Sequence, residues 1–196
     1  MNILVIKSSV FSDGGNSSAL VNAKVAALKA AHPDATIVER DLGANPIPHL
    51  DGDRVGAFFT PAENRTAEQQ QVDDFSMTLI EELKAADQVV VGVPMYNFGI
   101  PSQLKSWIDH VARAGITFRY TENGPQGLIG DKPVTVVAAR GGLYAGTEND
   151  TVTPYIKLFF SFVGITDVRF VFAEGLNMGD DMKDKAMDEA RAAVAQ

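Results

Sequence analysis

The fold is decided by the stretch NILVIK, Asn2 to Lys7, and by the polar segment Ser8–Ser18 that follows it at once. A short, continuous apolar run is typical of a strand that is buried on both faces of a sheet. Val21, Val25 and Leu28 then recur at the spacing of one helical face. Strand, polar loop and amphipathic helix in this order predict the opening unit of a layered α/β sheet.

The same alternation continues along the chain. Further strands are predicted from apolar or alternating runs at Ala35–Asp41, Gln88–Val93, Pro133–Ala139 and Asp167–Ala173. Apolar stripes at helical spacing predict helices around Val72–Leu83, Leu104–Val111, Val152–Val163 and Met182–Val194. Buried strands that alternate with helices indicate a parallel sheet with helices on both faces. Ligands of such sheets bind beyond the carboxyl ends of the strands.

Two segments interrupt this alternation. Residues Leu42–Asn64 are rich in proline and show little periodicity, yet they contain the apolar pair Phe58 and Phe59. A structureless connection of this length is usually functional or disordered, so we expect a lid or an interface. Residues 116–130 alternate and then turn, which predicts an inserted hairpin. We see no domain boundary and expect one domain over residues 1–196.

Composition excludes several classes of function. Lysine and arginine number 17 against 25 aspartates and glutamates, a formal net charge of −8, which argues against a nucleic-acid partner. Cysteine is absent, which removes disulfides, thiolate nucleophiles and iron–sulfur clusters. The histidines His32, His49 and His110 are not at metal-ligand spacing, so we expect no metal, and we expect His110 at the surface.

Nothing in the sequence predicts a membrane segment. The apolar run Val89–Met95 is far shorter than the about 20 residues that a spanning helix needs. The start of the chain reads as a strand rather than a secretory signal. We therefore expect no membrane partner and a cytoplasmic protein.

The loop Ser8–Ser18 has the features of an anion site. It combines hydroxyls and glycines with the start of a helix, where free N–H groups and the helix dipole favour negative charge. No lysine or arginine occurs between Ser8 and Asn22, and neither a Walker A loop nor a Gly-x-Gly-x-x-Gly turn is present. Neutral donors suit a single phosphate. The alternative is an ordinary loop with Ser17 as the helix N-cap.

Two further loops offer a slot for a flat ring. Pro94–Pro101 contains an aromatic pair, Tyr96 and Phe98, whose alternative role is simple packing. Ala139–Tyr144 contains paired glycines that present consecutive N–H groups, or that merely serve a tight turn. All three loops follow strands of one parallel sheet and therefore meet at one edge. The ligand this predicts is a mononucleotide with a flat polar ring, and FMN fits better than a dinucleotide.

The sequence resembles the FMN-dependent NADH-azoreductases, also described as NAD(P)H:quinone oxidoreductases, over nearly its whole length. The shared motifs are Lys7-Ser8-Ser9, Gly15-Asn16-Ser17, Pro94 to Phe98, Leu104-Lys105, Trp107-Ile108-Asp109, Gly115 to Tyr120, Gly124-Pro125, Gly127-Leu128 and Arg140-Gly141-Gly142. The resemblance implies an α/β, flavodoxin-like, doubly wound, five-stranded parallel sheet in the order 2-1-3-4-5, and a homodimer.

The family's flavin contacts carry over position by position. They map onto Ser9, Gly15, Asn16, Ser17, Met95, Tyr96, Asn97, Phe98, Ala139, Arg140, Gly141 and Gly142. The family usually has serine at the positions of Gly15 and Ala139, so two hydroxyl contacts are missing here and backbone N–H groups must serve. We expect the N–H groups of Gly141 and Gly142 near N1 and O2 of the ring, where reduction places negative charge.

The resemblance also implies an activity. FMN is tightly bound, one per subunit, and no protein residue is catalytic: NADH or NADPH gives a hydride to flavin N5, and a quinone or azo compound then takes it in a ping-pong sequence. Tyr120 and Phe162 are expected as walls of the substrate pocket, although Phe162 lies in an apolar helix and fits the core equally well. Phe59, beside Phe58, is expected to close the site from the partner subunit.

Two other functions remain open. A flavodoxin-type electron carrier would share the parallel sheet, the FMN-binding site and the acidic net charge. Such a carrier does not need the Leu42–Asn64 segment or the hairpin. A flavin-free signalling domain of the same topology would be colourless. Its phosphorylation site would require clustered acidic residues after the first strand, where this chain has serines.

Overall fold

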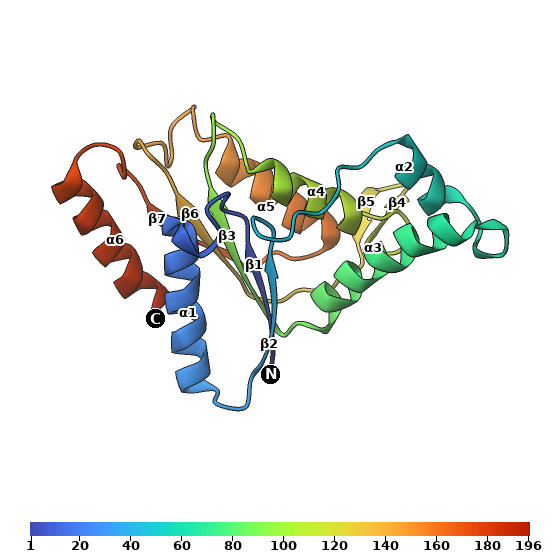
Figure 1. Ribbon diagram of the computed structural model, residues 1–196, viewed down its shortest axis with the longest axis horizontal. Helices are drawn as coiled ribbons and strands as arrows, with labels where there is room; N and C mark the ends of the chain where they lie inside the picture. Colours follow the sequence, from blue (N-terminus) through green and yellow to red (C-terminus); the bar gives the residue numbers. More distant parts are fainter.

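The computed structural model describes residues 1–196 and is built around a five-stranded parallel sheet (Figure 1). Its strands are β1 (Asn2–Lys7), β2 (Thr36–Asp41), β3 (Gln88–Pro94), β6 (Val134–Ala139) and β7 (Val168–Ala173). They lie in the order β2-β1-β3-β6-β7. Counted along the chain, these strands have the order 2-1-3-4-5, which confirms the predicted doubly wound sheet.

The central strands are buried because helices cover the sheet on both sides. In β3 and β6 the valines face neighbours on each side, and Val90 pairs with Val5 of β1 and with Thr135 of β6. The outer strands β2 and β7 are partly exposed. A strand that is buried on both faces needs apolar residues without alternation, which is why the runs in β1, β3 and β6 are continuous.

The helices form two layers, with α1 (Asn16–Ala31) and α6 (Asp180–Val194) on one face. The other face is covered by α3 (Ala67–Ala85), α4 (Ser102–Val111) and α5 (Val152–Val163), as Figure 1 shows. Successive side chains of β1 point to opposite faces of the sheet. Val5 packs in the hydrophobic core beneath α1 and α6, and Leu4 packs in the core beneath α3, α4 and α5. Each buried side chain of this size contributes roughly 1.5–3 kcal/mol.

The segment Leu42–Asn64 is more regular than expected. It contains the helix α2 (Gly52–Phe59), which begins where the Asp51 carboxylate accepts a hydrogen bond from the Arg54 N–H at 2.9 Å. A short 3-10 turn, Ala62–Asn64, follows. The expectation of a structureless connection was wrong, because an eight-residue helix shows too little periodicity on its own and is held by packing on α3.

His110 is buried, not at the surface. Its ring lies edge-on between Phe58 of α2 and Phe75 of α3, with centroid separations of 6.0 and 5.9 Å. The Nδ1 atom is 2.8 Å from the Ser106 carbonyl oxygen. The surface expectation failed because α2, which supplies part of the cover, was not predicted as a helix.

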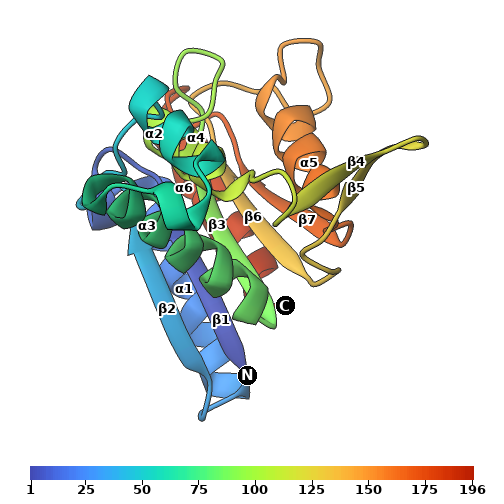
Figure 2. The same cartoon turned by 90° about the vertical axis from the view of Figure 1, so that its right-hand side faces the viewer.

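A two-stranded hairpin projects from the body of the protein beside α5 (Figure 2). It consists of β4 (Phe118–Thr121) paired antiparallel with β5 (Gly124–Gly127). A side chain at Gly127 would place its Cβ 2.0 Å from the Gly164 nitrogen at the end of α5, so only glycine permits this close approach. No helix of the structure combines the length and apolar character needed to cross a membrane.

Candidate functional site

Two adjoining cavities lie at the carboxyl edge of the sheet, where the loops after β3 and β6 rise together at the top of Figure 1. The inner cavity, of about 210 Å³, is lined by Ser9, Phe11, Gly15, Asn16, Ser17, Pro94, Met95, Tyr96, Ala139, Arg140, Gly141, Leu176 and Asn177. The outer cavity, of about 430 Å³, is lined by Met95, Asn97, Phe98, Gly141, Gly142, Tyr144 and Asn177. All twelve residues predicted to contact a cofactor therefore line one cavity or both.

The first loop is joined to the second by hydroxyl groups. The Val10 N–H donates to the Tyr96 hydroxyl at 3.3 Å, and the Phe11 N–H donates to Ser9 Oγ at 3.2 Å. Ser9 Oγ itself lies 3.4 Å from the Tyr96 hydroxyl. Ser8 Oγ donates to the Gly92 carbonyl at 2.6 Å and fixes the base of the loop on β3. The wall of the inner cavity is thus held from two strands.

Lys7 supports the first loop from outside the cavity. Its ammonium lies 2.8 Å from the Asp13 carboxylate and 3.0 Å from the Glu39 carboxylate, although the side chain is almost fully buried. Burial alone would lower the pKa of Lys7, but the hydrogen bonds and charges of Asp13 and Glu39 outweigh it and raise that pKa. Lys7 is therefore engaged, and the cavity has no free cation on this side.

The helix α1 begins at the floor of the inner cavity. The N–H groups of Asn16, Ser17 and Ser18 have no acceptor in the chain, and the helix dipole adds positive potential there. Ser17 Oγ is buried and also has no partner. A buried hydroxyl without a partner is costly, so this atom indicates an acceptor group in the cavity.

Gly15 leaves the space in which such a group could sit close to the backbone. A Cβ at this position would lie 2.2 Å from Ser9 Oγ and 2.6 Å from Ser9 Cβ. The backbone of Gly15 has an ordinary extended conformation, with φ −80°, so the constraint is steric alone. Any larger side chain at this position would require Ser9 to adopt another position.

The second loop makes a tight turn that presents Phe98. Tyr96 and Gly99 exchange backbone hydrogen bonds of 3.0 Å, and the two residues between them, Asn97 and Phe98, have φ values of 49° and 63°. Left-handed backbone is unfavourable for a phenylalanine, at roughly 1–2 kcal/mol. The Phe98 ring lies edge-on to Tyr144, with centroids 5.7 Å apart, at the mouth of the outer cavity.

The third loop supplies two free donors. The N–H groups of Gly141 and Gly142 have no acceptor in the chain, whereas the carbonyl groups accept from Asn177 N–H and Gly175 N–H at 3.0 Å each. A Cβ at Gly141 would meet the Asn177 amide nitrogen at 2.6 Å, so glycine lets Asn177 pack on the loop. Paired free N–H groups of this kind suit an acceptor that carries partial negative charge.

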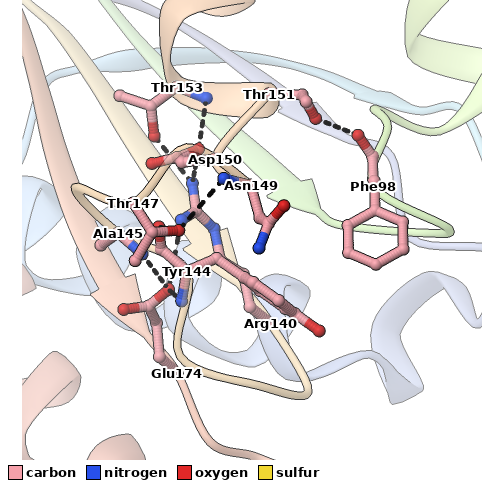
Figure 3. Close-up of polar contacts among 10 residues, drawn as sticks. All are labelled: Phe98, Arg140, Tyr144, Ala145, Thr147, Asn149, Asp150, Thr151, Thr153 and Glu174. Atoms are coloured by element: carbon pink, nitrogen blue, oxygen red, sulfur yellow. Dashed lines mark hydrogen bonds and ion pairs between the residues drawn. The ribbon is translucent and has the colours of Figure 1, made fainter.

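Arg140 is engaged by other residues of this chain. Its side chain is fully buried and donates to Asp150 at 2.8 Å, to Thr153 at 2.7 Å and to Glu174 at 3.1 Å (Figure 3). Its backbone N–H and carbonyl are also used, by Ala173 and Leu176. Arg140 lines the inner cavity, but both of its Nη atoms are engaged by side chains of this chain, and its buried Nε has no partner in the chain.

The three residues predicted for a substrate pocket are not at the cavities. Tyr120 is 75% exposed on the hairpin, and Phe59 is 79% exposed on α2. Phe162 packs against Phe118, with ring centroids 4.2 Å apart. None of the three lines either cavity within one chain.

The predicted cofactor contacts did not include five residues that line the cavities: Phe11, Pro94, Tyr144, Leu176 and Asn177. Phe11, Pro94 and Tyr144 lie in the three predicted loop segments, and Leu176 and Asn177 follow β7. Leu176 and Asn177 follow the last strand, and β7 ends at the same edge of the sheet as the other parallel strands. This position in the sequence indicates that both residues lie near the ligand-binding edge.

The arrangement of groups defines what can bind. The inner cavity offers free N–H groups and hydroxyls, and the charge of its one arginine, Arg140, is paired with Asp150 and Glu174; this donor set fits one phosphate group. The outer cavity offers the paired N–H groups of Gly141 and Gly142 beside Phe98 and Tyr144, which fits a planar polar ring. Since the cavities share Met95, Gly141 and Asn177, one ligand can occupy both.

Comparisons with known proteins agree with this geometry. A family model described as a flavodoxin-like fold matches residues 1–196. A protein of Alcanivorax borkumensis named FMN-dependent NADH:quinone oxidoreductase is 77% identical, over 98% of this chain and 97% of its own length.

Two solved structures are also similar. A crystal structure of an azoreductase from Bacillus anthracis has a TM-score of 0.90 and 31% identity, and the match covers 100% of this chain and 97% of that one. An FMN-dependent NADH-azoreductase from the same species, crystallised in complex with FMN, has a TM-score of 0.87 and 27% identity over 98% and 97% of the chains.

Proposed function

We propose the function of this chain from its family: it belongs to the family described as a flavodoxin-like fold, which matches it from end to end. The chain is an FMN-dependent NADH:quinone oxidoreductase with azoreductase activity. The names of the relatives support this activity. They also favour it over the alternative of an electron carrier without substrate turnover.

One observation of the site carries the proposal. Ser17 Oγ is buried without a partner beside the free N–H groups of α1, and the free N–H groups of Gly141 and Gly142 lie at the other end of the same pair of cavities. A phosphate needs the first set of donors and a flavin ring the second. The residues present therefore fit FMN.

The residues of this chain bind, orient and shield the cofactor. Asn16 and Ser17 hold its phosphate, and Gly141 and Gly142 donate to its ring, with Phe98 and Tyr144 as aromatic walls. When bound, FMN supplies the two-electron chemistry that joins the oxidation of NADH or NADPH to the reduction of a quinone or azo compound. No aspartate, glutamate, histidine, lysine or cysteine lines either cavity. Tight binding of one FMN per chain is part of the proposal.

Comparison of FMN with riboflavin tests the two ends of the site. Riboflavin lacks the phosphate, so Ser17→Ala should weaken FMN binding about tenfold, the effect of one hydrogen bond to a charged group, and leave riboflavin binding unchanged. Ser161→Ala, on the exposed side of α5, is the matched control. Titration by flavin fluorescence gives both dissociation constants. A wild-type chain that binds neither flavin at micromolar concentration would contradict the proposal.

Turnover distinguishes an enzyme from a carrier. Purified protein with FMN should oxidise many equivalents of NADH when benzoquinone is present, and the same assay with NADPH measures the preference between the two donors. An azo dye replaces the quinone in a third assay. If the protein oxidises only one equivalent of NADH per FMN although the quinone is present, it is an electron carrier and not an enzyme.

The site is completed by a second copy of the chain. Phe59 and Tyr120 are large, exposed and apolar, and they lie on projecting elements, α2 and the β4–β5 hairpin. Exposed aromatic residues that line no cavity of their own chain fit an interface. In the homodimer, Phe59 would close the partner's pocket, and Tyr120 and Phe162 are proposed as walls of the substrate pocket. Sedimentation equilibrium tests the dimer, and cell fractionation tests the cytoplasmic location that we propose with it.

A further inference from the structure

We propose that Arg140 is the positioning residue of the outer cavity, which sets both of its aromatic walls without contacting the ligand. The inference rests on the proposed function, because it concerns the FMN ring. The Arg140 guanidinium is fully buried and is covered by the Phe172 ring, whose centroid lies 4.9 Å from Cζ. Both of its Nη atoms are held by side chains of this chain, so its influence on the outer cavity passes through these partners.

The first path leads through Glu174 to the Tyr144 wall. Glu174 Oε1 accepts from Arg140 Nη1 at 3.1 Å and from the N–H groups of Tyr144 and Ala145 at 2.8 Å each. One carboxylate oxygen thus joins the guanidinium to the backbone that carries the Tyr144 ring. Charge-assisted hydrogen bonds are short and directional, so the loop has one favoured position while the carboxylate is held.

The second path leads through Asp150 to the Phe98 wall. Asp150 Oδ1 accepts from Arg140 Nη2 at 2.8 Å and from the Thr153 N–H at 3.0 Å, which fixes the start of α5. The neighbouring Thr151 hydroxyl donates to the Phe98 carbonyl oxygen. Figure 3 shows Phe98 and Tyr144 beside this cluster, and their rings lie edge-on to each other with centroids 5.7 Å apart. The strained turn at Phe98 is therefore tied to the same guanidinium as Tyr144.

Electrostatics couple the two paths. Burial alone would raise the pKa of Asp150, but hydrogen bonds from Thr153 and Arg140 and the charge of Arg140 lower it, so the carboxylate stays ionised. Glu174 is 16% exposed and depends on the same cation. The carboxylates of Asp150 and Glu174 share the Arg140 guanidinium, whose two Nη atoms can each donate to one of them. A lysine has a single ammonium nitrogen and cannot match this geometry.

The experiment compares Arg140→Lys with the wild-type full-length chain. Before FMN is added, amide hydrogen exchange should show that Tyr144 and Ala145 lose about tenfold in protection, while the strand amides of β1 and β3 do not change. Titration should show that the affinities for FMN and riboflavin fall by the same factor, roughly tenfold, because the ring end is affected and the phosphate end is not. The matched control is Arg169→Lys, an exposed arginine paired with Asp167 on the neighbouring strand.

A second variant keeps the test open if Arg140→Lys does not fold. Glu174→Gln retains an oxygen that accepts from Tyr144 and Ala145 but removes the charge that pairs with Arg140, and it should give the same pattern. Unchanged riboflavin affinity in a folded variant, or a loss confined to FMN, would overturn the inference, since a merely structural arginine lowers only the melting temperature. If the wild-type chain binds neither flavin, the proposed function itself fails, and this inference with it.

Discussion

The Arg113 guanidinium lies flat against the Phe58 ring, with Cζ 3.8 Å from the ring centroid. This contact joins α2 to the residue that follows α4 and covers the buried His110 ring. The segment that looked structureless in the sequence is thereby fixed on the body of the protein. The buried Ala57 and the hydrogen bond from Arg65 Nε to the Thr60 carbonyl oxygen add to this attachment.

Phe58→Leu should therefore destabilise the protein, by about 1–2 kcal/mol, because a cation–π contact and an aromatic edge contact are both lost. Phe59→Leu is the matched control, since its side chain is 79% exposed in a single chain. Urea unfolding of both variants, below the concentration at which the chains associate, measures the difference. Equal stabilities would show that α2 is not held by Phe58.

Asp73 should contribute more than Phe58 to the free energy of unfolding, because its carboxylate neutralises two buried cations. Its carboxylate lies 2.6 Å from Arg65 and 2.7 Å from Arg113, and its side chain is only 10% exposed. Asp73→Asn leaves both guanidinium groups without a counter-charge, which should cost about 3–5 kcal/mol. The neighbouring Asp74 is exposed, so Asp74→Asn should change stability by less than about 0.5 kcal/mol. Thermal unfolding at neutral pH compares the two.

His110 should make stability depend on pH. Burial lowers the pKa of His110, with smaller contributions from the charges of Arg54 and Arg113, while the Ser106 carbonyl and Asp109 oppose the shift. The unfolded chain therefore takes up a proton near pH 6.5, the ordinary histidine value, and the folded chain only at lower pH. The contribution of His110 is present above about pH 6.5 and is lost as the pH falls through the lowered pKa of the folded state.

His110→Phe keeps the edge contacts with Phe58 and Phe75 and removes the titrating group. The fall in unfolding free energy between pH 7 and pH 5 should become shallower in this variant. His32→Phe, at the exposed end of α1, is the control and should retain the wild-type slope. A slope that persists in His110→Phe would place the acid sensitivity elsewhere.

Gly15→Ala should weaken FMN binding and cost about 1–3 kcal/mol of stability, because the new Cβ overlaps Ser9. Adding Ser9→Gly removes the overlapping atoms and should recover most of the stability. Gly56→Ala is the control: nothing lies within 4 Å of its Cβ, and it should stabilise α2 by up to about 1 kcal/mol. Calorimetry of the three variants, with FMN titration, gives both quantities.

Local sequence patterns predicted the sheet because they report burial directly. The continuous apolar runs of β1, β3 and β6 have no polar face, and that is a property of a strand between two helical layers. Helix α3 also begins at a local pattern, a capping box in which Gln69 N–H donates to Thr66 Oγ1 and Thr66 N–H donates to Gln69 Oε1.

The sequence by itself determined the strand order, because the resemblance to a known family implies it. It also determined that three loops meet at one edge of the sheet, because strands and helices alternate along the chain. Only the tertiary structure decided which groups are free to bind. The resemblance placed Arg140 among the flavin contacts, but its guanidinium is buried and paired with Asp150 and Glu174. Whether a donor is free depends on every acceptor that the fold brings within hydrogen-bonding distance, and no local pattern contains that information.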